Sequence, residues 1–456
     1  MHTASNAQGR DSRGLREPCL ISTKAVIQMF YCGVDIGKYN HAVCIINEDG
    51  DTVLKLKAGN NAAGFSKLKA HLERLQLGPD MAEFCMEASG HYWLNLYCYL
   101  DQLGYRVGVI NPIQSKALRN VYVRKTKTDP KDALLLADLL RLGRVPQTSL
   151  ASETVIKLQT LSRARFEFVR QIGRLKNRIL GTLDRIFPEY SDCFSDVFVR
   201  SSRELLKKYT APEDLAEVDL SELAEFLSKH SRNRLGRERA EQIQALAKGT
   251  IGIHLAKDAF TLHLRLLLKQ IEFIEEQITI IEEAIDQVME ELRPTPDTPY
   301  RHVIETIPGI GPVLAAAIIG ELGDDVSKFK NAMSVVAYAG IDPSVNSSGE
   351  FEGTRNRISK RGSPLLRHSL WLAAVTARNY IPELKEYYEK KLREGKHYKV
   401  ATCAVARRLT HIIYSICKNQ RPFDPNHVWE APRKKVNPDP YAVFKDRTTK
   451  KLLDFT

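Results

Sequence analysis

An apolar repeat in residues 256–292 constrains the fold of this chain more than any other feature. Its members alternate in spacings of four and three residues. They are Phe260, Leu264, Leu267, Ile271, Ile274, Ile278, Ile281, Ile285, Val288 and Leu292. This spacing places all of the side chains on one stripe of a helix and predicts a long helix of the coiled-coil type. The partner of the stripe is either a second copy of the chain or another helix of the same chain.

A second long helix is predicted over residues 153–186. Its apolar seam contains Leu158, Leu161, Phe168, Ile172, Leu175, Ile179 and Ile186, with Arg165 and Thr182 as breaks. The other faces are strongly basic, and we predict that they bind nucleic acid through Arg163, Arg170, Arg174, Lys176 and Arg178. Self-association through the two long helices predicts a homo-oligomer, either a dimer or a tetramer.

Residues 29–143 alternate between strand and helix signals. Strands are predicted at Met29–Ile36, His41–Asn47, Thr52–Lys57, Phe84–Glu87 and Arg106–Ile110. Helices are predicted at Asn61–Leu75, Tyr92–Leu103 and Pro130–Leu142. Three meandering strands followed by alternating helices and strands predict an α/β domain with a mixed sheet, in the order of the ribonuclease H-like fold.

Four carboxylates fall at the ends of these elements. Asp35 lies on the first strand between Gly33 and Gly37, and Glu87 ends a short apolar strand. A carboxylate in such a strand is costly to bury unless it is paired or bound to a cation. Asp129 and Asp132 lie three residues apart at the start of a helix, which places both on one face. Four converging carboxylates form an all-oxygen site that suits Mg²⁺, and Mn²⁺ can substitute.

The chain of 456 residues is long enough for two or three domains. Lys and Arg outnumber Asp and Glu by 67 to 55, and a net charge of +12 favours a polyanionic partner. The eight cysteines are scattered without a C-x-x-C pair, which is typical of buried thiols in a reducing cytoplasm. No apolar run reaches the length of a membrane span, so we expect a cytoplasmic protein that does not enter a membrane.

A breaker-rich segment at residues 293–299 marks a domain boundary. The predicted organisation is a flexible leader at 1–28, an α/β catalytic domain at 29–150, a helical coiled-coil region at 151–295, a mainly helical domain at 300–420 and a basic, Pro-rich tail at 421–456. The mainly helical domain opens with Pro308-Gly309-Ile310-Gly311-Pro312. This turn either holds a phosphate on its backbone N–H groups or packs two helices closely.

A polar loop at residues 341–367 contains Ser347 and Ser348 among many cations. It has little apolar periodicity, and its composition suits phosphate binding. The cations that we predict to contact phosphate are Lys360, Arg361 and Arg367, for which a solvated basic face is the alternative.

Three segments of the chain resemble the DEDD transposases of insertion sequences, a group described as bridge-RNA-guided recombinases with a Holliday-junction-resolvase-like N-terminal domain. They are Gly33-Val34-Asp35-Ile36-Gly37-Lys38, Met86-Glu87-Ala88-Ser89-Gly90-His91-Tyr92-Trp93 and Lys127-Thr128-Asp129-Pro130-Lys131-Asp132-Ala133. The block from Ala339 through Ser348-Gly349 to Arg367 is similar to the C-terminal transposase domain of that family.

The resemblance implies that Asp35, Glu87, Asp129 and Asp132 bind metal and that Ser348 is a nucleophile that forms a phosphoserine link to DNA. Ser347 is the neighbouring alternative. It also implies that a structured guide RNA pairs with the element ends and the target DNA. A second hypothesis is a structure-selective endonuclease of the Holliday-junction type, in which water is the nucleophile. A scaffold that only binds nucleic acid is the third.

Overall fold

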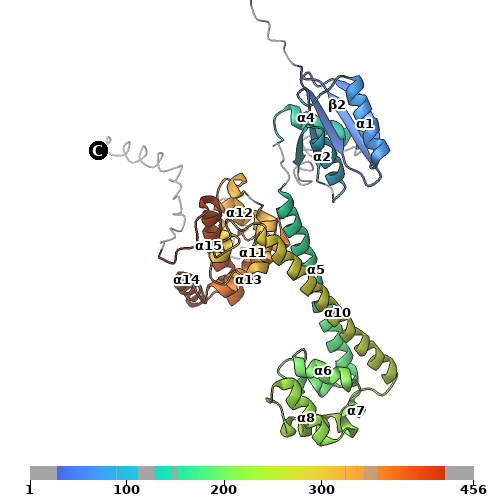
Figure 1. The fold of residues 1–456 in the computed structure, drawn as a ribbon, viewed down its shortest axis with the longest axis vertical. Coiled ribbons are helices and arrows are strands. Elements are labelled where there is room, and N and C mark those ends of the chain that lie inside the picture. The colour runs from blue at the N-terminus through green and yellow to red at the C-terminus, as the bar shows by residue number, and fades with distance from the viewer. Residues whose placement is uncertain are drawn as a thin grey trace, which may run out of the picture. The chain divides into compact units, whose positions relative to one another are not determined.

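The computed structural model describes residues 28–88, 90–110, 129–145, 151–323, 325–343, 347–348, 351–352 and 357–426. The leader predicted at 1–28 and the tail predicted at 421–456 therefore lie almost wholly outside the described residues. The chain divides into two compact units, Met1–Leu150 and Ala151–Thr456. Figure 1 shows the helices and strands of both units.

The first unit is built on a five-stranded sheet with the order β3-β2-β1-β4-β5. Its strands are β1 (Phe30–Asp35), β2 (Asn40–Ile46), β3 (Thr52–Gly59), β4 (Ala82–Glu87) and β5 (Arg106–Ile110). The first three strands pair antiparallel, whereas β1–β4 and β4–β5 pair parallel. The mixed sheet predicted from the sequence is confirmed, and its order is that of the ribonuclease H-like fold.

Helices cover both faces of this sheet (Figure 1). On one face, α1 (Ala62–Arg74) and α2 (Trp93–Gln102) bury a core that includes Val34, Phe84 and Met86. Helix α1 begins where Asn61 Oδ1 accepts a hydrogen bond from the Gly64 N–H, a typical N-cap. On the other face, the helix that the described residues contribute is α4 (Asp129–Arg141).

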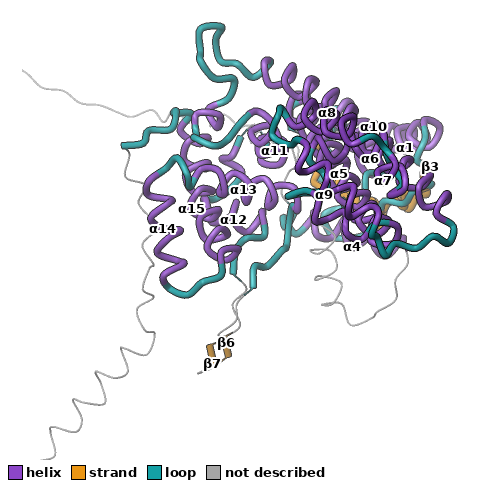
Figure 2. The backbone as a smooth tube through the Cα atoms, turned by 90° about the horizontal axis from the view of Figure 1, so that it is seen from below, coloured by secondary structure: helices purple, strands orange, loops and turns teal. Residues whose placement is uncertain are grey.

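The second unit is almost entirely helical (Figure 2), and two long helices run through it. They are α5 (Glu153–Ile186) and α10 (Lys257–Glu290), which pack against each other. At one end of the pair lie η1 (Pro188–Cys193), α6 (Arg200–Lys208), α7 (Pro212–Glu217), α8 (Leu220–Ser231) and α9 (Arg237–Lys248). Their core closes around Leu175 and Ile179 of α5 and Leu264 and Leu267 of α10.

The apolar repeat of α10 is used within the chain. Its members Leu264, Leu267 and Ile271 are buried at one end, and Ile285 and Val288 at the other. The structure thus contains the second of the two arrangements that the repeat allows, two helices pairing within one chain. A coiled coil between chains is not confirmed, because the spacing fixes the buried stripe and not the partner that covers it.

At the other end of the pair, the second unit forms the predicted mainly helical region. Its elements are η2 (Val303–Thr306), α11 (Pro312–Leu322), η3 (Val326–Lys328), α12 (Ala332–Ala339), β6 (Ser347–Ser348), β7 (Phe351–Glu352), α13 (Pro364–Ala377), α14 (Pro382–Arg393) and α15 (Tyr398–Asn419). Helix α11 is buried among α5, α10, α13 and η2. Among the helices described, none is long and apolar enough to cross a membrane.

The turn at residues 308–312 packs helices closely, one of its two predicted roles. Gly309 has φ +93°, a conformation that favours glycine. A Cβ on Gly309 would lie 2.8 Å from the backbone nitrogen of Ala377 in α13. A Cβ on Gly311 would have no atom within 4 Å. The close contact with α13 therefore requires glycine at position 309 and not at position 311.

Candidate functional site

Two carboxylates end neighbouring strands of the first unit. Strands β1 and β4 are parallel, and their register pairs Val34 with Met86. One residue further along each strand are Asp35 and Glu87. Side chains alternate between the faces of a sheet, so both carboxylates lie on the face opposite Val34 and Met86. That is the face covered by α4.

Helix α4 places a third carboxylate at the same end of the sheet. A Cβ on Gly33 would lie 1.9 Å from the Ala133 carbonyl oxygen and 2.4 Å from the Ala137 nitrogen, so the helix backbone rests directly on β1. At its other end, Arg141 Nη1 donates to the Glu48 carbonyl oxygen, 3.2 Å away in the β2–β3 hairpin. The first turn of α4, which contains Asp132, therefore lies at the carboxyl end of β1.

The three described carboxylates differ in exposure. Glu87 and Asp132 are 9% and 7% exposed, and Asp35 is half-buried. Asp129 is the first residue of α4, but its side chain lies outside the described residues. The structure thus brings Asp35, Glu87 and Asp132 to one end of the sheet and places Asp129 one helical turn before Asp132.

Glu87 and Cys85 lie on the same face of β4, and both are buried. Burial raises the pKa of the Cys85 thiol to about 12, and the negative charge of Glu87 adds to this shift. Carboxylates in such surroundings are stabilised when a cation binds. Within the described residues, no group of three or more His, Cys, Asp or Glu side chains has the arrangement of a metal site. The side chain of the predicted fourth ligand, Asp129, does not belong to the described residues.

The predicted nucleophile belongs to the second unit. Ser347 and Ser348 form β6, which pairs antiparallel with β7 so that Ser348 lies opposite Phe351. The side chains of both serines lie outside the described residues. The hairpin leaves the helical core next to a bridge between Pro343 and Ile358.

The predicted phosphate-binding cations follow this hairpin. Lys360 and Arg361 are exposed, and Lys360 has φ +53°. Arg367 lies on α13 and donates from Nη1 to the Ala339 carbonyl oxygen, 3.1 Å away at the end of α12. Lys360 and Arg361 are therefore accessible to a phosphate, whereas Arg367 also holds α12 to α13.

The basic residues predicted on α5 have different surroundings. Arg174 and Arg178 line a groove of about 640 Å³ between α5 and α10, together with Lys269 and Phe273. Lys176 lies over the ring of Phe198, with its Nζ 4.8 Å from the ring centroid. Lys269 of α10 adds a third cation to the groove. It was not predicted to bind nucleic acid, and the local signal for it is its position between the apolar residues Leu267 and Ile271 of the repeat.

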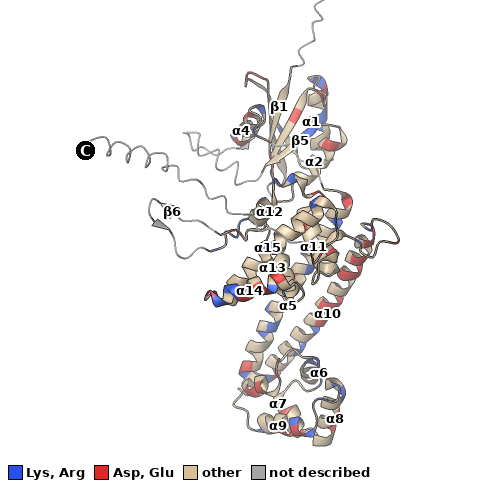
Figure 3. Ribbon diagram, turned by 90° about the vertical axis from the view of Figure 1, so that its left-hand side faces the viewer, with Lys and Arg blue, Asp and Glu red and all other residues tan. Residues whose placement is uncertain are grey.

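Two other arginines of α5 are held by carboxylates. Arg163 Nε lies 2.8 Å from Glu321 Oε1 on α11, and Arg170 Nη1 lies 2.8 Å from Glu167 Oε1 on the same helix. In Figure 3, the red ribbon segments of acidic residues recur along the C-terminal half of α10, which packs against α5. The basic face of α5 is thus partly neutralised within the chain.

Two family profiles match separate parts of the chain, and the first of them extends beyond the first unit to the end of α5. Residues 32–188 match the profile of the DEDD transposase domain of IS110 elements, described as a transposase. Residues 301–389 match the transposase family IS116/IS110/IS902. The two matches together span more than half of the chain.

Curated relatives match over most of the chain. An insertion element IS116 protein of 44.8 kDa from Streptomyces clavuligerus is 26% identical, over 87% of this chain and 96% of the relative. A mini-circle putative transposase for IS117 from Streptomyces coelicolor is 24% identical, over 86% of this chain and 95% of the relative. A pilin gene-inverting protein of Moraxella lacunata is 23% identical, over 86% of this chain and 97% of the relative.

These matches define the chain as a transposase of the insertion-element class. It belongs to the IS116/IS110/IS902 family. Among solved structures, T. thermophilus RuvC in complex with a Holliday junction substrate matches at 13% identity, over 26% of this chain and 99% of that chain, with a TM-score of 0.21.

Proposed function

We propose that this transposase cleaves and rejoins DNA strands at a metal site formed by Asp35, Glu87, Asp129 and Asp132. The observation that supports the proposal is the convergence of Asp35, Glu87 and Asp132 at one end of the sheet, two of them nearly buried. An all-oxygen donor set of this kind fits Mg²⁺, with Mn²⁺ as a substitute. When bound, the ion polarises the scissile phosphate and neutralises charge in the transition state.

Ser348 supplies the nucleophile in this proposal. Its Oγ forms a bond to phosphorus while the bond from phosphorus to one sugar oxygen breaks, and the serine proton passes to the departing oxygen. Rejoining reverses these steps. A sugar hydroxyl of another strand attacks the phosphorus of the phosphoserine, its proton passes to the serine oxygen, and Ser348 is released. Lys360 and Arg361 are exposed, follow the β6–β7 hairpin in the sequence and contribute positive charge for the phosphate.

DNA is the proposed substrate, because the matched relatives include a putative mini-circle transposase and a pilin gene-inverting protein. The proposed guide is a structured RNA, bound through phosphates by Arg174, Lys176 and Arg178 of α5. The carboxylates and Ser348 belong to different compact units. We therefore propose a dimer or tetramer in which one site combines units from two chains.

A covalent adduct tests the nucleophile. The purified protein is incubated with the terminal DNA of its element, Mg²⁺ and co-purified RNA, and the products are resolved on a denaturing gel and by mass spectrometry. We expect a protein–DNA adduct at Ser348 that disappears in Ser348→Ala and in Asp132→Ala. Ser347→Ala is the matched control and should retain the adduct.

Cleavage without an adduct would contradict the role of Ser348. Water would then be the nucleophile, and the protein would act as a structure-selective endonuclease. Mixing Asp35→Ala and Ser348→Ala subunits tests the shared site, because each variant retains the half that the other lacks. Mixtures that stay inactive would contradict a site shared between chains.

A further inference from the structure

Two lysines stand on the edge of the sheet in line with the carboxylates. Lys55 and Lys57 are exposed residues of the edge strand β3. The register pairs Lys57 with Ala42 of β2, and Ala42 with Asp35 of β1. Residues that are paired across a sheet point to the same face, so Lys57 shares a row and a face with Asp35. Lys55 lies two residues away on that same face.

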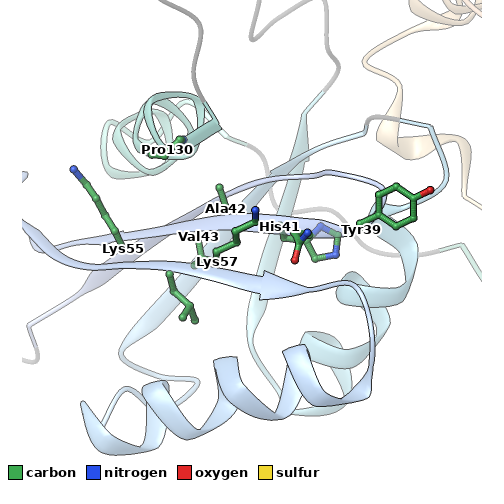
Figure 4. Close-up of a pocket in the computed structure, with 9 residues that line it drawn as sticks. Tyr39, His41, Ala42, Val43, Lys55, Lys57 and Pro130 are labelled. Carbon is green, nitrogen blue, oxygen red and sulfur yellow. The ribbon is translucent and has the colours of Figure 1, made fainter.

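A groove connects these lysines to the first turn of α4. It has a volume of about 530 Å³, and Lys55, Lys57, Ala42 and Pro130 are among the residues that line it. Figure 4 shows both lysines on the strand side of the groove and Pro130 on the helix side. Pro130 lies between Asp129 and Asp132 in the sequence, so the groove runs from the lysines to the carboxylate end of the sheet.

Neither lysine is neutralised by a carboxylate in the part of the chain that the structure describes, at the 4.0 Å limit for an ion pair. On α1, by contrast, Lys69 pairs with Glu73 at 3.7 Å. Two free cations beside a cluster of carboxylates offset the repulsion between that cluster and a polyanion. Their Cα atoms are about 7 Å apart along the edge, so they form a short row.

We propose that Lys55 and Lys57 bind the phosphate backbone of the DNA strand that passes along β3 to the carboxylate site. This inference rests on the proposed function and adds the path of the substrate to it. Lysine binds phosphate as a point charge, so these contacts position the strand without reading its bases. The competing explanation is that the lysines only prevent edge-to-edge pairing of β3 with another chain.

Binding to full-length protein distinguishes the two explanations. The probe is a short fluorescein-labelled single-stranded DNA, followed by anisotropy over a range of salt concentrations in the Asp132→Asn background. For Lys55→Gln/Lys57→Gln we expect affinity to fall on the order of ten-fold at low salt, and the slope of log K against log[salt] to fall by about 1.4, as for two lost phosphate contacts on a single strand.

A double variant on α1, Lys67→Gln/Lys69→Gln, is the matched control, because it removes the same charge from the opposite face of the sheet. It should retain the slope of the parent protein. Acetylation of lysines followed by mass spectrometry adds a local readout: bound DNA should protect Lys55 and Lys57 and leave Lys67 reactive.

An unchanged slope in the β3 variant, equal losses in the α1 variant, or equal acetylation of Lys55 with and without DNA would each overturn the proposal. Strand cleavage is not measured in these experiments. A protein that binds DNA along β3 but forms no Ser348 adduct would therefore refute the proposed chemistry and still support the path of the strand.

Discussion

The ion pair between Arg163 and Glu321 leads to a prediction about the stability of the second unit. The side chain of Glu321 is fully buried, and its Oε1 accepts a hydrogen bond from Arg163 Nε at 2.8 Å. Its Oε2 has no hydrogen-bond partner among the described residues. Arg163→Ala would leave a buried carboxylate without a counter-charge, which costs about 3 to 5 kcal/mol for a fully buried pair.

The expected loss for Arg163→Ala is smaller, because 56% of the arginine side chain is exposed and water screens the pair. We expect the free energy of unfolding of the second unit to fall by about 2 kcal/mol. Arg170→Ala is the matched control on the same helix. Its partner Glu167 is 51% exposed, so the change should stay within about 0.5 kcal/mol.

Urea unfolding of the full chain measures these values. Trp371 lies on α13 in the second unit, so its fluorescence reports on that unit once Trp93 and Trp429 are replaced by phenylalanine. Arg163→Met/Glu321→Met should recover most of the loss, because an apolar pair removes the buried charge. Equal stability of the Arg163 and Arg170 variants, or a double variant no more stable than Arg163→Ala, would refute the reasoning.

Two further perturbations test the first unit. Gly33→Ala should destabilise it by several kcal/mol, because the new Cβ would meet the Ala133 backbone at 1.9 Å, whereas Gly78→Ala, with open space, should be nearly neutral. A urea titration followed by the fluorescence of Trp93 on α2, with Trp371 and Trp429 replaced by phenylalanine, measures both variants. Burial lowers the pKa of the fully buried His41, so the folded chain binds fewer protons than the unfolded chain below pH ~6.5. Stability should therefore fall as the pH drops below that value, and this dependence should weaken in His41→Leu; an unchanged pH profile would exclude His41 as its source.

Much of the first unit follows from local pattern. Strands β1, β2 and β5 lie within one or two residues of their predicted bounds, because the short alternation of apolar residues and the turns between them are local signals. The convergence of Asp35 and Glu87 was also predictable. Both residues end apolar strands, and parallel strands end at the same edge of a sheet.

The second unit contains ion pairs that the local sequence pattern does not predict. Arg165 interrupts the apolar seam of α5, yet its Nε lies 2.7 Å from Glu282 Oε1 on α10, so the interruption is an ion pair between the long helices. Glu321 lies in a helix of small apolar residues, and its partner Arg163 is 158 residues away in the chain. Periodicity indicates which face is buried, but it does not name the residue that meets a buried charge.

Gly33 and Asp35 have different roles in the carboxylate site: Asp35 is one of the carboxylates, and Gly33 allows α4 to approach the sheet. Residues two apart on a strand share a face, so Gly33 lies under α4 in line with Asp35. Without a Cβ, Gly33 lets the backbone of α4 approach β1 at Ala133 and Ala137, and this approach brings Asp132 to the carboxylate end. The positions of the carboxylates therefore depend on Gly33, which has no side chain that could bind a metal ion. A larger side chain at Gly33 would separate α4 from the sheet even if Asp35, Glu87 and Asp132 were all retained.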